Sequence, residues 1–265
     1  MATQIKLKGF VNLNINTDEY SFLKPINEEN NKSTQNVNSA GRAPSSKVVA
    51  EGNVPIDLEN LFIKLNFPED AFYNIHLKGS RLYGTVNVIQ DMNAVSDWDL
   101  ISIVDTETPY QFVEFVYNGI NYDVHIFNKQ EFLKKLDEHD MDSLEFLFHP
   151  NSAIILDKEN YSVNIDKNKL INSALLESNK QWYIAKAILN DKSQDAYLGL
   201  KRIWHSIRYL IFTEQILKYG KIYNFSAANS IYADIINSKS TNFSYFETNF
   251  QSIKTQYENI VKSYL

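Results

Sequence analysis

The sequence predicts an α+β fold, in which a small mixed sheet is followed by a helical domain. Runs of β-rich residues are concentrated between positions 73 and 127, and an Asn-Gly pair joins two of them. Helical spacing of apolar residues dominates from position 167 onward. Because side chains repeat every two residues along a strand and about every 3.6 along a helix, this change of period separates a sheet-forming half from a helical half.

Composition places the chain among folded globular proteins. Its 265 residues suffice for one large domain or two modest ones, and 16 Phe, 16 Tyr and 3 Trp supply apolar surface for a core. The absence of cysteine excludes disulfides and thiolate zinc sites. No run of ~18 apolar residues is present, and the N-terminus lacks the pattern of a secretory signal. We therefore expect a soluble, cytoplasmic protein with no membrane partner.

Three regions are expected along the chain. The first, residues 1–53, begins with a possible strand at 1–15 and continues into a segment at 27–53 that is typical of loop or disorder, because it is too polar to bury surface. The second region is a core at 54–157. The third is a helical domain at 158–265.

Within the core, a helix is predicted by the spacing of Leu58, Leu61, Phe62 and Leu65. A strand at 73–78, a short helix or turn at 81–84 and a strand at 99–104 follow.

The clearest local signal is a hairpin. Asn118-Gly119 separates β-rich runs at 111–117 and 120–127. A type I′ turn needs positive φ at both central positions, which Asn and Gly tolerate, so the two runs are expected to pair directly.

The rest of the chain has helical spacing. Helices are expected at 129–148, 167–189, 193–219, 226–237 and 243–264. Gly220 follows the helix at 193–219 and suits a C-terminal cap.

The residues best suited to catalysis are one glycine-containing turn and three aspartates. Gly79-Ser80-Arg81 ends the run at 73–78, and a Gly-Ser turn lets backbone N–H groups approach a phosphate closely, because Gly has no Cβ. Asp97 and Asp99 lie two positions apart and point to one side of a strand, and Asp123 on a neighbouring strand would complete a carboxylate cluster that suits Mg²⁺. Each pattern is weak alone, but their order along the chain favours nucleotidyl or phosphoryl transfer.

Charge is unevenly distributed. Residues 180–265 hold 11 Lys and Arg against 6 Asp and Glu, whereas the whole chain has a net charge of −6. A basic half opposite an acidic half would suit a nucleotide site between them, although such asymmetry is common in proteins without one. No dense basic patch is present, so we do not expect long double-stranded nucleic acid as a partner.

Three segments carry a resemblance to a known superfamily. Gly79-Ser80-Arg81-Leu82-Tyr83-Gly84, Ser96-Asp97-Trp98-Asp99 and Asp123-Val124-His125-Ile126-Phe127 resemble the nucleotidyltransferases of the DNA polymerase β superfamily. The chain is most similar to small bacterial and phage nucleotidyltransferases with a Gly-Ser-Arg-x-Tyr-Gly motif, whose third acid is followed by a helix ending in Glu-x-Leu-Phe, as in Glu145-Phe146-Leu147-Phe148. The resemblance covers residues 56–150. One departure is the spacing, since sixteen residues separate Ser80 from Asp97 and include an insert at 86–95.

The resemblance implies that region 54–157 is a catalytic core that transfers NMP from an NTP to an acceptor hydroxyl. Asp97, Asp99 and Asp123 would bind two Mg²⁺ ions, and Asp123 would also help to deprotonate the acceptor. Gly79 and Ser80 would hold the β- and γ-phosphates. Arg81 would add positive charge there, or would lie solvated at the start of a helix. The acceptor would be a protein side chain, an RNA end or a small molecule.

A basic stripe on the helix at 193–219 is a further candidate for nucleotide binding. Lys201, His205 and Arg208 lie at i, i+4 and i+7 and so share one helix face, which would reach the triphosphate or would simply be solvated.

Other polar and aromatic residues near the motifs are expected to play supporting or structural roles. His125 would support the metal ligands or would be a hydrogen-bonded sheet histidine. His76 and His149 are expected to be structural, and Tyr83 to serve packing.

Two other classes of function remain open from the sequence. The chain could be a catalytically inactive relative that binds a nucleotide or acts as a protein-interaction module, or its helical half could serve an assembly or antitoxin-like role. The presence of all three acids favours the enzyme.

Overall fold

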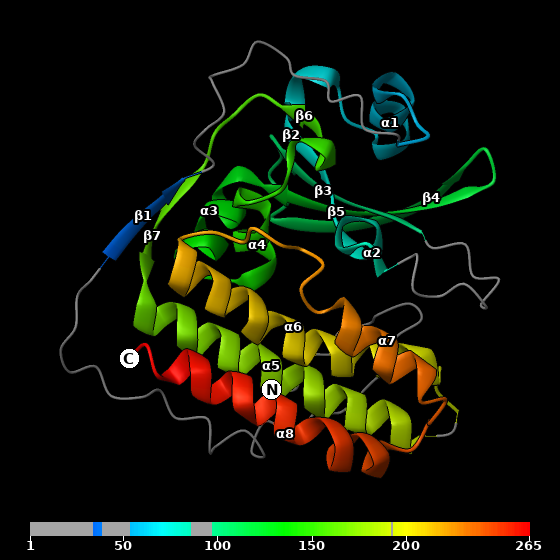
Figure 1. Cartoon of the computed structure of the whole chain (residues 1–265). Coiled ribbons are helices and arrows are strands. Elements are labelled where there is room, and N and C mark those ends of the chain that lie inside the picture. Colours follow the sequence, from blue (N-terminus) through cyan, green and yellow to red (C-terminus); the bar gives the residue numbers. More distant parts are fainter. Residues whose placement is uncertain (1–33, 39–53, 86–96, 192) are drawn as a thin grey trace, which may run out of the picture.

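The computed structural model describes residues 34–38, 54–85, 97–191 and 193–265 (Figure 1). It confirms the predicted fold class, since a five-stranded mixed sheet is followed by a helical C-terminal region. The strand predicted at 1–15 and the insert at 86–95 lie outside the described residues.

The sheet has the strand order β4-β5-β3-β2-β6. Its central pair, β3 and β5, runs parallel, and each other neighbouring pair runs antiparallel. The strands are β2 (Phe72–Leu77), β3 (Trp98–Val104), β4 (Tyr110–Tyr117), β5 (Ile120–Asn128) and β6 (Ile154–Asp157).

The predicted hairpin is confirmed. Asn118 has φ 51° and Gly119 has φ 77°, so both turn residues adopt the left-handed backbone conformation that a type I′ turn requires. Tyr117 pairs with Ile120 immediately beside the turn. The turn chemistry thus fixes the register of β4 on β5.

Two strands correct the predictions for their segments. Polar composition predicted loop or disorder across 27–53, yet Thr34–Asn38 forms strand β1, which pairs antiparallel with β7 (Ser162–Asp166) in a separate two-stranded sheet. Strand pairing is made by backbone N–H and C=O groups, so it does not need apolar side chains. Neither β6 nor β7 was expected, because both runs are short and their partners are distant in sequence.

The predicted helices are present, with one correction. The helix expected at 129–148 is two helices, because His139 takes φ 58° and Asp140 caps a new helix by accepting a hydrogen bond from the Ser143 N–H. Gly220, with φ 71°, caps α6 as expected. The helices are α1 (Leu58–Leu65), α2 (Gly79–Tyr83), α3 (Lys129–Asp137), α4 (Met141–Leu147), α5 (Lys167–Asn190), α6 (Ala196–Tyr219), α7 (Asn229–Asn237) and α8 (Phe243–Lys262).

The sheet separates two apolar cores. Leu100 and Val104 of β3 pack in the core on the α1 side, whereas Ile101 and Ile103 point into the larger core shared with the C-terminal helices. Figure 1 shows α1 above the sheet and the layered helices α6, α5 and α8 below it. The larger core contains residues from both the sheet and the C-terminal helices, on either side of the boundary expected at position 157. The sheet and the helical region therefore pack as neighbouring layers.

Among the helices in the described part of the chain, none is both long and apolar enough to span a bilayer.

Candidate active site

Two adjacent strands, β3 and β5, bring the predicted acids together where these strands begin. Asp99 on β3 pairs in register with Asp123 on the parallel strand β5, and Asp97 lies two residues before Asp99. Residues in register on adjacent strands point to the same side, and so do residues two apart. Asp99 and Asp123 therefore share the sheet face that carries Ile101 and Ile103, which is the face covered by the C-terminal helices.

The Gly-Ser turn lies directly against Asp99. The Lys78 N–H donates to the Asp99 carbonyl at 2.8 Å, and the Ser80 backbone N–H donates to the Asp99 carboxylate. Gly79 has φ 71°, and a Cβ added there would lie 2.0 Å from Asp99 Oδ2. Only glycine fits this position, because it tolerates the backbone angle and leaves room for the carboxylate. The turn and the first acids thus form one unit.

The three acids interact electrostatically. Burial, together with the negative charges of Asp99 and Asp97, raises the pKa of Asp123 from 3.8 to about 6. Glu114, opposite Asp123 on β4, acts in the same direction. Burial also raises the pKa of Asp99, whereas the positive charges of Lys78 and Lys201 oppose that rise. The site is a cluster of carboxylates that repel one another, with two lysines close enough to offset part of the repulsion.

The donor atoms at this edge fit Mg²⁺ in their chemistry. All are carboxylate oxygens, which this hard cation prefers, and a divalent ion would relieve the repulsion that raises the pKa of Asp123. The three carboxylates do not point to one common position, since no group of three His, Asp or Glu in the described part of the chain is placed to hold a metal ion.

Arg81 contacts the strand that carries the acids. Its guanidinium lies 4.1 Å above the Trp98 ring, and its Nε donates to the Asp97 carbonyl at 3.4 Å. Arg81 therefore holds the segment that enters β3. This contact was not foreseen from the sequence, which indicated either a phosphate or solvent as its partner.

The basic stripe of α6 divides into three different environments. Lys201 is half-buried and lowers the pKa of both Asp99 and Asp123, which places its positive charge beside the acids. Burial and the neighbouring Arg208 lower the pKa of His205 well below its ordinary value, so this imidazole is neutral at pH 7. The three residues therefore do not form one cationic surface.

Arg208 corrects the prediction most clearly. Its side chain is 1% exposed, and its guanidinium donates to Glu145 Oε1 at 2.6 Å. Burial lowers the pKa of Arg208, but the adjacent Glu145 carboxylate more than offsets this effect and keeps the pKa above its ordinary value. The expectation that Arg208 faces a bound triphosphate is wrong for this structure, because the side chain is enclosed and its charge is already paired.

Tyr83 completes a buried triad with this ion pair. Its hydroxyl donates to Glu145 Oε2 at 2.7 Å, and its ring lies 4.2 Å from the Arg208 guanidinium carbon. The triad joins α2, α4 and α6. The packing role expected of Tyr83 is thus accompanied by a polar role, and the Glu-x-Leu-Phe segment supplies its carboxylate.

Two charged residues of the site were missed at the sequence level. Lys78 ends the strand before Gly79, and its Nζ lies 3.9 Å from Asp142 Oδ2 on α4. Burial raises the pKa of Asp142, but Lys78 and Arg208 outweigh burial and hold it below its ordinary value. The available signals were the position of Lys78 next to the Gly-Ser turn and that of Asp142 one helical turn before Glu145.

The histidines have local partners. His125 Nδ1 is 2.9 Å from the Tyr110 hydroxyl, and burial together with Lys78 lowers its pKa to about 3, so it is neutral at pH 7. It therefore fits the sheet-histidine alternative. His76 and His149 are buried with their Nδ1 atoms 3.3 Å apart, and His76 stacks on the Phe146 ring, as expected of structural residues.

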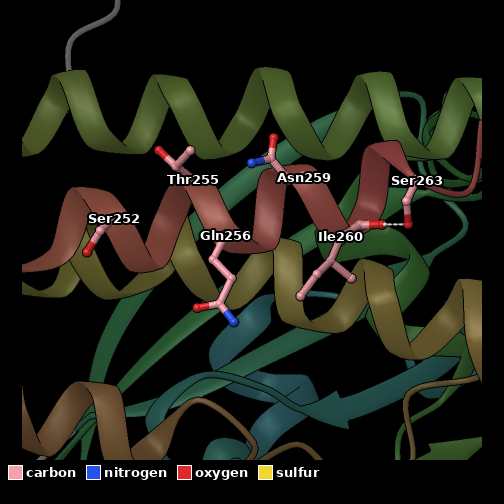
Figure 2. A pocket seen from close by; sticks show the side chains of 6 residues that line it. All are labelled: Ser252, Thr255, Gln256, Asn259, Ile260 and Ser263. Atoms are coloured by element: carbon pink, nitrogen blue, oxygen red, sulfur yellow. Dashed lines mark hydrogen bonds between the residues drawn. The ribbon is translucent and has the colours of Figure 1, made fainter.

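A surface hollow elsewhere on the molecule carries none of these groups. Figure 2 shows its lining on α8, where the side chains are uncharged. It is open, and it contains neither the acids nor the lysines of the sheet edge. The lining residues are Ser252, Thr255, Gln256, Asn259, Ile260 and Ser263.

Comparisons with known proteins show similarity to solved structures but to no family or curated protein. A solved structure of a nucleotidyltransferase-like protein from Exiguobacterium sibiricum is similar over 77% of this chain and 73% of its own, at 11% identity and a TM-score of 0.29. A likeness of this degree carries no argument about function, which depends on the site itself.

Arg208→Met is predicted to reduce the free energy of unfolding by about 3–5 kcal/mol, because it leaves the Glu145 carboxylate buried and unpaired. Adding Glu145→Gln should recover part of that loss, since no buried charge then remains. Urea unfolding measures both effects, with Lys218→Met on the exposed end of α6 as the control. A loss no larger than that of the control would show that the pair does not hold the helices together.

Asp123→Asn is predicted to raise the melting temperature by about 2–4 °C at pH 7.5 without Mg²⁺, which corresponds to about 1 kcal/mol after screening. The folded-state pKa of Asp123 is about 6, above the ordinary 3.8, so wild-type stability falls as pH rises through that window. The amide removes this loss, and the two proteins should melt alike at pH 4. Glu107→Gln on the surface is the matched control. An unchanged or lower melting temperature at pH 7.5 would contradict the repulsion at this site.

Proposed function

We propose that the chain is a Mg²⁺-dependent nucleotidyltransferase that moves NMP from an NTP to an acceptor hydroxyl. The observation that carries this proposal is the in-register pairing of Asp99 with Asp123 beside the Gly79-Ser80 turn. A glycine-containing turn next to a repelling carboxylate cluster suits a substrate that brings both phosphates and cations.

Each residue has a distinct role in the proposed reaction. Asp97, Asp99 and Asp123 would hold Mg²⁺, as two ions in the mechanism that the motif implies. When bound, the metal would neutralise charge on the triphosphate and stabilise the attacking and leaving oxygens. Lys201, already beside the acids, would contact the phosphates together with the Gly79 and Ser80 backbone.

The proposed reaction is an in-line displacement at the α-phosphorus of the NTP. The acceptor oxygen forms a bond to the α-phosphorus, the bond from that phosphorus to the bridging oxygen breaks, and pyrophosphate leaves. The hydroxyl proton passes to the Asp123 carboxylate. Asp123 is in register with Asp99 on the adjacent strand, so its carboxylate would lie beside the other acids and would accept this proton as a general base.

The double variant Asp97→Asn/Asp99→Asn is predicted to lower NMP transfer by more than ~100-fold. Removing a residue that only supports a metal ligand costs up to about 100-fold, and these two residues would be the ligands themselves. Labelled NTP, Mg²⁺ and cell lysate supply the assay. A thermal-shift titration gives a second readout, in which Mg²⁺ should raise the melting temperature of the wild type but not of the double variant. Asp105→Asn, at the opposite end of β3, is the control.

Full transfer by the double variant would refute the assigned roles. Nucleotide binding without transfer by the wild type, with every lysate and NTP tried, would favour the inactive relative instead.

Lys201→Ala is predicted to weaken NTP binding by about ten-fold or more, because a charge-assisted hydrogen bond contributes roughly 1.5–3 kcal/mol. The affinity is measured by calorimetry with Mg²⁺-NTP. Lys218→Ala is the matched control on the same helix, since Lys218 is exposed and lies about 25 Å along the axis from Lys201. Equal affinities for the two variants would leave the phosphate contacts to the Gly79-Ser80 turn and to other residues.

A further inference from the structure

A row of exposed side chains on β4 continues directly from the proposed site. Tyr110, Phe112 and Val116 are 44%, 43% and 58% exposed, and Glu114 lies exposed between them. Because alternate residues of a strand share a face, these four side chains form one line, which we call the β4 row. Large apolar groups gathered on an exposed strand commonly mark a site of interaction.

The register places the β4 row on the face of the acids. Glu114 pairs with Asp123, Phe112 pairs with His125, and Tyr110 pairs with Phe127. The Phe112 and His125 rings lie 5.0 Å apart, and the Tyr110 hydroxyl is 2.9 Å from His125 Nδ1. The row therefore borders the carboxylate proposed as general base.

Strand β4 is also an edge of the sheet. Within the described residues it pairs only with β5, so its other side presents backbone N–H and C=O groups to a further strand. An extended polypeptide uses such an edge by adding one strand, with alternate side chains against the exposed row.

Charge distinguishes a polypeptide from a nucleic acid at this edge. Residues 110–128 contain no Lys or Arg, whereas Glu114 and Asp123 are acidic. Nucleic-acid binding depends on basic residues that neutralise phosphates. An acidic and aromatic surface instead complements a neutral or basic peptide.

We propose that β4 is the acceptor site of the nucleotidyltransferase, and that the acceptor is an extended polypeptide segment added to this edge. The proposal rests on the proposed function and names its acceptor class. The acceptor side chain must carry a hydroxyl toward Asp123, and the reaction forms its phosphodiester to NMP while pyrophosphate leaves and Asp123 takes the proton.

Reach selects among the hydroxyl side chains. Neighbouring strands lie about 4.8 Å apart, so an added strand lies about 10 Å from β5 and the acceptor must extend across β4. Tyrosine is the longest side chain with a hydroxyl, and its ring can pack on the aromatic β4 row. Serine and threonine are too short to cross this spacing. A tyrosine opposite Glu114 is therefore the acceptor that the geometry favours.

The test uses the full chain, Mg²⁺ and labelled NTP with an immobilised library of ten-residue peptides. Each peptide alternates Val, Thr and Lys around a central Tyr, and matched libraries place Phe or Ser at the centre. Label is expected on the Tyr library alone. Phe112→Ala should reduce that labelling at least ten-fold through a higher KM for peptide, with NTP affinity unchanged. Ile63→Ala, which truncates an exposed apolar residue on the opposite side of the sheet, should leave labelling unchanged.

Several outcomes would overturn the inference. These are equal labelling by Phe112→Ala and wild type, no label on any Tyr peptide, label on RNA rather than protein in a lysate, or a dimer that Phe112→Ala dissociates in sedimentation, since a second copy would then occupy β4. The proposed function would survive each of these if Asp99-dependent transfer to any acceptor persists. It fails separately if the wild type neither binds Mg²⁺-NTP nor transfers NMP.

Discussion

The buried ion pair between Arg208 and Glu145 is the contact on which the arrangement of the candidate site depends. Enclosing two charges costs several kcal/mol, and the cost is offset only when each charge is well satisfied. Here Glu145 accepts hydrogen bonds from both Arg208 and Tyr83, and aromatic rings surround the guanidinium, with Phe212 at 5.1 Å. Because Tyr83 ends α2 and Gly79 begins it, the same pair also fixes the turn that contacts Asp99.

The rotation of α6 follows from this contact. With Arg208 directed inward to α4, Lys201 lies about two helical turns earlier, near the edge where β3 and β5 begin. One cation of the helix thus serves packing, and another offsets the acids. Because α6 carries both the paired Arg208 and the Lys201 beside the acids, it must keep a fixed position against the sheet. The apolar core shared by the sheet and the C-terminal helices holds it there.

Local signals predicted much of the fold, and distant contacts account for what they missed. The hairpin was predictable because Asn118 and Gly119 supply positive φ by themselves. The burial of Arg208 was not, since its partner Glu145 lies 63 residues away in the sequence. Helical spacing correctly placed Lys201 and Arg208 on one face of α6. Spacing does not show that α4 packs on the part of this face that carries Arg208 and leaves Lys201 beside the acids. Strand β1 was missed for the same reason, because its partner is β7.

The acids at the sheet edge are the part of the site whose residues were predicted and whose energetics were not. Asp123 was expected to join Asp97 and Asp99 from a neighbouring strand, and the parallel register of β3 and β5 places Asp99 beside it. Burial, together with the negative charges of Asp99 and Asp97, raises the pKa of Asp123 to about 6, and both causes are known only from the structure. A stable fold gains nothing from such repulsion, and strongly perturbed carboxylates gather at sites where chemistry uses them. The glycine at position 79 leaves room for the Asp99 carboxylate, so the turn after β2 and the first acid of β3 can pack directly against each other.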